Sequence, residues 1–113
     1  MKTIKLGNKL VGDEQQTFVI AEIGINHQGD INIAKQLIDE AKDCGADAVK
    51  LQKRTISRIL TKEGLEMSYD NRNSFGKTYG EHKHALELSE SDYRELLDYC
   101  KQLDIQFSAS GWD

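Results

Sequence analysis

Charged and polar side chains interrupt three short apolar segments of the sequence. Glu22 lies in the first segment, Lys50 and Gln52 lie in the second, and Ser110 ends the third. A carboxylate can act as a base, an ammonium group attracts phosphate or carboxylate, and an amide can bind sugar hydroxyls. Burying such a charge is costly unless a partner or a ligand compensates for the lost water. The pattern therefore favours a ligand-binding or catalytic site, and a buried Glu22–Lys50 ion pair is the alternative.

The loop that follows the first segment adds further candidates. Asn26 and Gly29 precede an expected helix, and this arrangement can hold an anion on backbone N–H groups. His27 could serve as an acid–base group, a metal ligand or a packing residue, and packing is favoured for a lone histidine. For Gln52, a satisfied interior amide is an equal alternative to a sugar contact.

The remaining reactive groups are expected to be structural or solvated. Cys44 and Cys100 lie on helical apolar stripes and are expected to be inert core residues. Lys53 and Arg54 add positive charge after the second apolar segment, and we expect them to form a solvated pair.

Strands are predicted at the three apolar segments, residues 17–23, 46–52 and 105–110. Short apolar runs with β-branched or aromatic residues are typical of strands buried on both faces of a parallel sheet. Residues 4–11 predict a small hairpin that turns at its central Gly-Asn pair.

Two helices are predicted between these strands. Asp30 is a good N-cap for the first helix, whose apolar residues recur at helical spacing until Gly45 ends it. Ser89 caps the second helix, with Asp92 as its capping-box partner.

The segment 54–84 lacks a clear helical or strand period. We expect one short helix near residues 57–64 and a plain turn at Tyr79. A connection of this length is usually functional or mobile. His82 and His84 lack a third ligand nearby, so they are expected to be solvated rather than metal-bound.

The order strand–helix–strand–helix–strand predicts parallel strands with right-handed crossovers. Ligands bind at the carboxyl ends of such strands, so the polar groups named above, together with Asp113, are expected at one rim. The order fits half of a doubly wound sheet or the start of a barrel, and a complete barrel needs about 250 residues. Three parallel strands leave two bare edges, so residues 1–113 are predicted to be one part of a larger α/β domain.

Composition argues against several classes of function. The 113 residues include 15 basic and 19 acidic side chains, for a net charge of −4, so no basic surface for nucleic acid is expected. No run of about 18 apolar residues is present for a membrane span. The N-terminus lacks the apolar core of a signal peptide, and two cysteines are too few for a disulfide scaffold. We therefore expect a cytoplasmic protein.

Several stretches, in the right order and spacing, resemble one enzyme family. Residues 21–30 read A-E-I-G-I-N-H-Q-G-D and residues 45–52 read G-A-D-A-V-K-L-Q. Residues 86–89 and the F-S-A-S of residues 107–110 complete the set. Together the stretches cover nearly the whole chain, and the sequence resembles the sialic acid synthase family, which includes the legionaminic and pseudaminic acid synthases.

The resemblance implies a (β/α)8 barrel, often followed by a small antifreeze-like domain, of which this chain would form about three βα units. It implies condensation of phosphoenolpyruvate with an open-chain acylamino sugar, in which water attacks C2 and phosphate leaves. It also implies a divalent ion, typically Mn2+, that polarises the sugar aldehyde, and a domain-swapped homodimer. The family's metal-binding histidines would lie beyond Asp113, so no metal ligand is expected here and the chain alone is expected to be inactive.

Matched by position, Glu22 corresponds to the family's active-site glutamate, a base or orienting group beside the reacting carbonyl. Lys50 corresponds to the lysine that holds the charge of phosphoenolpyruvate, and Gln52 to a glutamine that contacts the sugar. The other matches are substrate-binding positions, namely Asn26 and His27 in the loop that shapes the pocket, and Ser110 where the family commonly has threonine.

Two departures from the family pattern leave the sugar unassigned. Gly111 stands where the family has proline, and residues 53–84 differ from the N-acetylmannosamine type of sequence. Two other interpretations stay open: a non-catalytic flavodoxin-like binding module, and another sugar-acid synthase that uses phosphoenolpyruvate.

Overall fold

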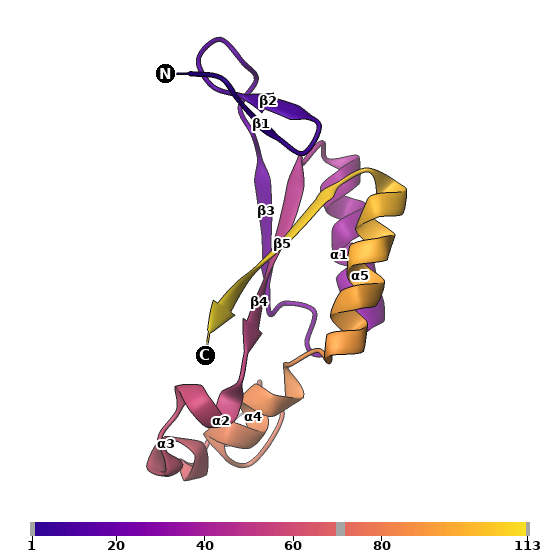
Figure 1. Cartoon of the computed structure of the whole chain (residues 1–113). Coiled ribbons are helices and arrows are strands. Elements are labelled where there is room, and N and C mark those ends of the chain that lie inside the picture. The colour runs from indigo at the N-terminus through magenta and orange to yellow at the C-terminus, as the bar shows by residue number, and fades with distance from the viewer. Residues whose placement is uncertain (1, 70–71, 113) are drawn as a thin grey trace.

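A three-stranded parallel sheet forms the centre of the computed structural model, which describes residues 2–69 and 72–112 (Figure 1). Its strands are β3 (Ile20–Gly24), β4 (Ala48–Arg54) and β5 (Gln106–Trp112), and β4 lies between the other two. The predicted order of strands and helices is confirmed. Each strand pair is parallel, as expected when a helix connects consecutive strands.

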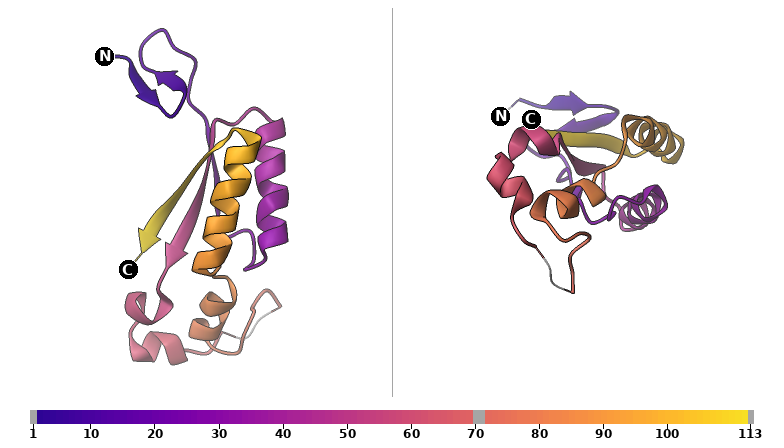
Figure 2. Two further views of the ribbon diagram at one scale, coloured as in Figure 1. Left: turned by 45° about the vertical axis from the view of Figure 1, so that its right-hand side comes forward. Right: turned by 90° about the horizontal axis from the view of Figure 1, so that it is seen from below.

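Helices α1 (Ile31–Asp43) and α5 (Glu90–Leu103) cover one face of this sheet (Figure 2). Their apolar stripes meet the sheet in one core, whose most deeply buried members include Ile38, Val49, Leu51, Leu96 and Cys100. Side chains alternate along a strand, so Lys50, between Val49 and Leu51, and Gln52, after Leu51, face away from the helices. The opposite face of the sheet is therefore free to carry polar groups.

The helix ends follow the sequence predictions. The Asp30 side chain accepts hydrogen bonds from the backbone N–H groups of Asn32 and Ile33, and such caps stabilise a helix by about 1 kcal/mol. Ser89 and Asp92 form a complete capping box at α5. Gly45 follows α1 with a φ of +86°, the left-handed conformation that glycine adopts most easily at a helix end.

The segment between β4 and α5 contains more helix than predicted. The single short helix expected near residues 57–64 is two helices, α2 (Ile56–Ile59) and α3 (Lys62–Glu66). The turn expected at Tyr79 was a wrong prediction, because α4 (Tyr79–Ala85) begins there with a Thr78–Glu81 capping box. Seven residues are too few to display a helical apolar period, and tertiary contacts define this helix instead. No described helix combines the length and apolar content that crossing a bilayer requires.

The predicted hairpin, β1 (Ile4–Leu6) and β2 (Lys9–Val11), is confirmed and lies at the amino ends of the parallel strands. The Gln106 side chain donates to the carbonyl oxygen of Leu6, which ties the hairpin to the start of β5.

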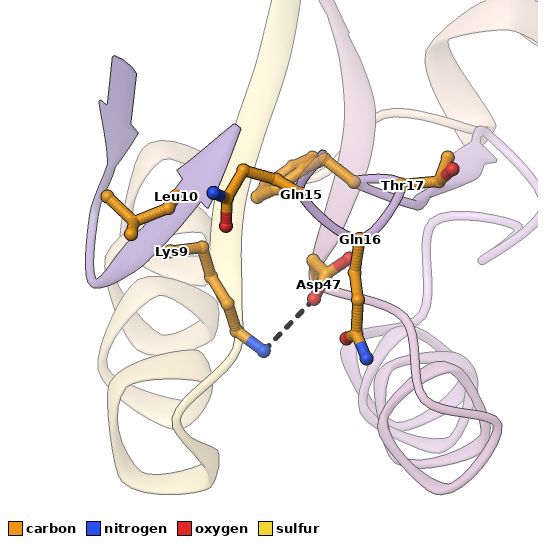
Figure 3. A pocket seen from close by; sticks show the side chains of 7 residues that line it. Lys9, Leu10, Gln15, Gln16, Thr17 and Asp47 are labelled. Carbon is orange, nitrogen blue, oxygen red and sulfur yellow. Dashed lines mark ion pairs between the residues drawn. The ribbon is translucent and has the colours of Figure 1, made fainter. Parts of the chain in front are cut away.

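Beside the hairpin lies a cavity of about 290 Å³, where Lys9 pairs with Asp47 at 3.1 Å (Figure 3). A hydrogen bond from the Val19 N–H and the Lys9 ammonium group lower the pKa of Asp47. Polar contacts at this end of parallel strands serve stability rather than catalysis.

Gly29 and Gly45 offer a matched test of the contact between the loop after β3 and the end of α4. Both glycines have positive φ, but a Cβ on Gly29 would overlap the carbonyl oxygen of Ala85, whereas nothing lies within 4 Å of a Cβ on Gly45. We expect Gly45→Ala to cost about 1–2 kcal/mol through backbone strain alone. Gly29→Ala should cost about 2–5 kcal/mol, because overpacking adds to that strain. Urea unfolding of both variants tests this, and equal midpoints would contradict the contact.

Candidate active site

Glu22 and Lys50 lie side by side on adjacent parallel strands. They are register partners of β3 and β4, and the Lys50 ammonium nitrogen lies 3.5 Å from a carboxylate oxygen of Glu22. Their side chains are 50% and 39% exposed, so the ion pair of the alternative forms but is not buried in this structure. Since Lys50 lies between the buried Val49 and Leu51, the pair projects from the face opposite the helices. It is therefore accessible to a ligand on that face.

Gln52 and Ser110 extend this polar row toward the carboxyl ends of the strands. Ser108 is the register partner of Lys50, and Ser110 is the register partner of Gln52. A Cβ on Gly24 would lie 3.6 Å from a Glu22 carboxylate oxygen and 3.9 Å from the Gln52 amide nitrogen. These side chains therefore converge around Gly24, where a bulge shifts the register of β3. The structure thus brings together the carboxylate, the ammonium group, the amide and the hydroxyl groups.

Among the described residues, Asn26 and His27 form their hydrogen bonds within their own loop rather than with that row, although Asn26 and Glu22 line one cavity beside β3. The Asn26 amide donates to the carbonyl oxygen of Ile23 and closes the turn after β3. His27 is fully buried, and its Nδ1 accepts a hydrogen bond from the Gly29 N–H. Burial lowers the pKa of His27, against a smaller opposing effect of Glu87, so the fold favours the neutral ring over the charged one. The packing interpretation of His27 fits this environment.

Arg54 is buried, so the prediction of a solvated Lys53–Arg54 pair was wrong. The Arg54 Nε lies 2.6 Å from Glu87, and Lys53 lies 3.6 Å from the other carboxylate oxygen. The Tyr93 hydroxyl donates to the carbonyl oxygen of Gln52, and burial, assisted by Glu87, raises the pKa of Tyr93 to about 12. This network fixes the carboxyl end of β4. The sequence signal that could have found it is Glu87 itself, a charge between two leucines directly before a helix cap.

Other predicted positions differ in part from expectation. Cys100 is buried, which raises the pKa of its thiol to about 11, but Cys44 is exposed and is not a core residue. His84 is exposed as predicted, whereas His82 is half-buried and packs on the ring of Tyr69. Asp113 lies outside the described residues. Over the ranges 2–69 and 72–112, no three histidine, cysteine or acidic side chains gather closely enough to hold a metal ion.

The Arg54–Glu87 pair makes a testable contribution to stability. Glu87→Gln removes the charge that compensates the Arg54 guanidinium, whose side chain is only 5% exposed. Removing one partner of a buried pair costs about 3–5 kcal/mol. Glu90→Gln is the matched control, because the Glu90–Arg94 pair is almost fully exposed and its loss should leave the unfolding midpoint unchanged. Urea unfolding of both variants gives the comparison, and similar midpoints would show that Glu87 is not required.

The buried His27 predicts a pH dependence of stability. The folded-state pKa of His27 lies below 6.5, so the folded chain binds a proton at this ring less tightly than the unfolded chain does. Its contribution to stability is therefore fully present above pH 6.5 and declines as the pH falls toward the folded-state pKa. We expect His27→Gln to show a smaller drop in melting temperature between pH 7.5 and 5.5 than the parent protein. His84→Gln, at an exposed position, should retain the parent's drop; an unchanged drop in His27→Gln would contradict this role.

Comparison with known proteins identifies the relatives of this chain. Residues 37–113 match the NeuB family. The N-acetylneuraminate-9-phosphate synthases of Mus musculus and Homo sapiens are each 50% identical over 103 residues, which cover 91% of this chain and 29% of theirs. An N,N'-diacetyllegionaminic acid synthase of Legionella pneumophila is 39% identical over 108 residues, or 95% of this chain and 30% of that protein.

Solved structures agree with this relationship. The N-acetylneuraminic acid (sialic acid) synthetase of Leptospira borgpetersenii, crystallised with citrate, superposes with a TM-score of 0.75 at 29% identity, covering 99% of this chain and 35% of that one. The chain spans 29% of the length of the curated relatives named first. Its three parallel strands, with the helices that connect them, correspond to the N-terminal part of the (β/α)8 barrel of these enzymes. The chain that carries Glu22 and Lys50 on adjacent strands therefore belongs to the NeuB family, as the sequence motifs predict.

Proposed function

We propose that the protein that carries this chain condenses phosphoenolpyruvate with an acylamino sugar to form a nonulosonic, sialic-type acid. The observation that carries the proposal is the accessible Glu22–Lys50 pair, joined by Gln52, on adjacent strands of a NeuB-family chain. Relatives that cover this chain almost completely are named as N-acetylneuraminate-9-phosphate and legionaminic acid synthases, which supports this class of product.

The reaction balances with water as the only further reactant. C3 of phosphoenolpyruvate bonds to the aldehyde carbon of the open-chain sugar, and the aldehyde oxygen takes a proton to become a hydroxyl group. Water adds to C2, phosphate then leaves from C2, and loss of the proton from the new C2 hydroxyl group gives the ketone of the 2-keto acid. The step therefore needs a cation for the phosphoenolpyruvate, a group that manages protons, and donors that orient the sugar.

The polar row of the sheet can supply these groups. Lys50 offers an ammonium group for the carboxylate or phosphate of phosphoenolpyruvate, and its 3.5 Å distance from Glu22 keeps both charges in one place. Glu22 accepts or orients a proton at the attacking water or the reacting carbonyl. Gln52 and Ser110, in register on β4 and β5, offer hydrogen bonds to sugar hydroxyl or acylamino groups.

Asn26 and His27 fit an indirect role. His27 is buried and binds the backbone of its own loop, so it shapes the loop rather than touching substrate. Asn26 is exposed at the turn, near the edge of β3 that also carries Glu22. We place Asn26 at the border of the substrate site and His27 behind it.

A divalent ion, expected to be Mn2+, would polarise the sugar aldehyde. The described residues do not offer a set of ligands for it, so its ligands would come from outside this chain, and we assign it no step here. A homodimer and an additional antifreeze-like domain complete the proposal and rest on the family resemblance alone. A cytoplasmic location is also proposed, and it rests on the N-terminal sequence and the cysteine content.

The test is phosphate release by the complete protein that carries this chain. We expect inorganic phosphate to appear only when phosphoenolpyruvate, an acylamino sugar and Mn2+ are all present. Glu22→Gln and Lys50→Ala should lower kcat/KM by about 100-fold or more, the usual scale for lost proton transfer or charge stabilisation.

Lys101→Ala is the control, since Lys101 is an exposed residue of α5 on the covered side of the sheet. It should retain parent activity. Inactivity of the parent protein with every plausible acylamino hexose would count against the proposal. Parent-like rates in the Glu22 and Lys50 variants would remove these residues from the site.

A further inference from the structure

A second polar cavity lies beyond Gln52, between the carboxyl ends of β4 and β5 and the helices α2 and α4. It has a volume of about 350 Å³, and α2 with its C-cap provides an apolar wall. We call it the distal cavity; its polar and aromatic lining consists of Gln52, Arg54, Tyr79, Lys83 and Trp112. Two of these side chains are cations and none is a carboxylate, so the described lining favours an anionic ligand.

Lys83 provides a cation that no acidic group of residues 2–69 and 72–112 neutralises. Its ammonium nitrogen lies 4.8 Å from the centre of the Tyr79 ring, and the described residues offer it no carboxylate partner. The aromatic ring holds the ammonium group in place without cancelling its charge. Lys83 can therefore bind an anion directly.

Arg54 provides a second donor that lacks an acceptor. Its Nε is occupied by Glu87, but its Nη2 is buried and has no hydrogen-bond partner among the described residues. A buried donor without a partner is costly, so such groups usually meet water or a ligand. The positive charges of Lys83 and Arg54 also lower the pKa of the neighbouring His82, second to the effect of burial. The surroundings of the cavity are thus electropositive.

The chemistry of the proposed reaction indicates which anionic group would lie in the distal cavity, away from the reacting carbons. Phosphoenolpyruvate supplies C1–C3 of the product, so C6 of a hexose acceptor becomes C9. Relatives with 50% identity are named for a 9-phosphate product, in which the phosphoryl group lies at the end of the acceptor farthest from the new bond. Gln52 lines the distal cavity and lies two residues beyond Lys50, about 7 Å along the strand. An extended hexose can bridge that interval.

We propose that the distal cavity binds the phosphoryl group of an acylamino sugar 6-phosphate, with Lys83 as its direct cation and Arg54 as a supporting donor. This inference rests on the proposed function. Tyr79 and Trp112 form aromatic walls against the sugar chain, while Gln52 contacts its middle. The phosphoryl group of phosphoenolpyruvate is the other possible source of the same chemistry, and the experiment below separates the two.

The experiment measures steady-state kinetics of the complete protein with the acylamino sugar in its 6-phosphate and unphosphorylated forms. We expect Lys83→Gln to raise KM for the sugar 6-phosphate about tenfold or more, the usual effect of losing one charge-assisted contact. KM for the unphosphorylated sugar and for phosphoenolpyruvate should change less than about twofold. Lys83→Arg should restore most of the affinity, and Lys62→Gln, an exposed position of α3, should behave as the parent.

Two outcomes would overturn the assignment: an equal rise of KM for both sugars, or a rise for phosphoenolpyruvate alone. Equilibrium binding of the sugar 6-phosphate, measured by calorimetry without phosphoenolpyruvate, separates this inference from the proposed function. Weaker binding to Lys83→Gln than to the parent supports the cavity even if the parent shows no turnover. Equal binding to both, or no binding to the parent, rules the cavity out.

Discussion

The register between the parallel strands is the constraint on which the site depends. Glu22 pairs with Lys50, and Lys50 pairs with Ser108, so three side chains from distant parts of the sequence line up across the sheet. A slip of one residue in either pair would turn a charged side chain into the core beneath α1 and α5. The buried Val49 and Leu51 on either side of Lys50 prevent that slip. Core packing on one face thus dictates the position of charges on the other.

The uncovered face and edges explain why polar and apolar surface coexist in this chain. Both outer strands, β3 and β5, present unpaired edges, and Val19, Ile20 and Trp112 are about half exposed. In a closed (β/α)8 barrel, further strands cover such edges and the uncovered face becomes the barrel interior. The row from Glu22 to Ser110 would then line that interior near its catalytic mouth, where reduced water strengthens each charge interaction.

The sequence predicts those features that depend on neighbours along the chain. Asp30 and Ser89 cap their helices because the capping side chain and its N–H partners lie within three residues. Glu22 and Lys50 stand out because each interrupts an apolar run. Arg54 and Glu87 are 33 residues apart in the sequence, so no local pattern could reveal which charge meets which. Helix α4 was missed although the Thr78–Glu81 capping box is a local signal for its start, because its seven residues show no apolar period. Its position also depends on the close packing of Gly80 against Leu65.

The Arg54–Glu87 pair has a consequence for specificity as well as for stability. Glu87, in the segment between α4 and α5, binds the last residue of β4, and Tyr93 of α5 holds the Gln52 carbonyl on the same strand. On the other side, Gly29 fits against the carbonyl oxygen of Ala85, which fixes the end of α4 against the loop after β3. Lys83 lies in this short helix, α4. Contacts at the end of α4 therefore tie Lys83 to β3 and β4, the strands that carry Glu22 and Lys50. Substitutions after Arg54, up to residue 84, can change the ligand's distal contacts while the Glu22–Lys50 pair stays in register, because that register depends on the core packing of Val49 and Leu51.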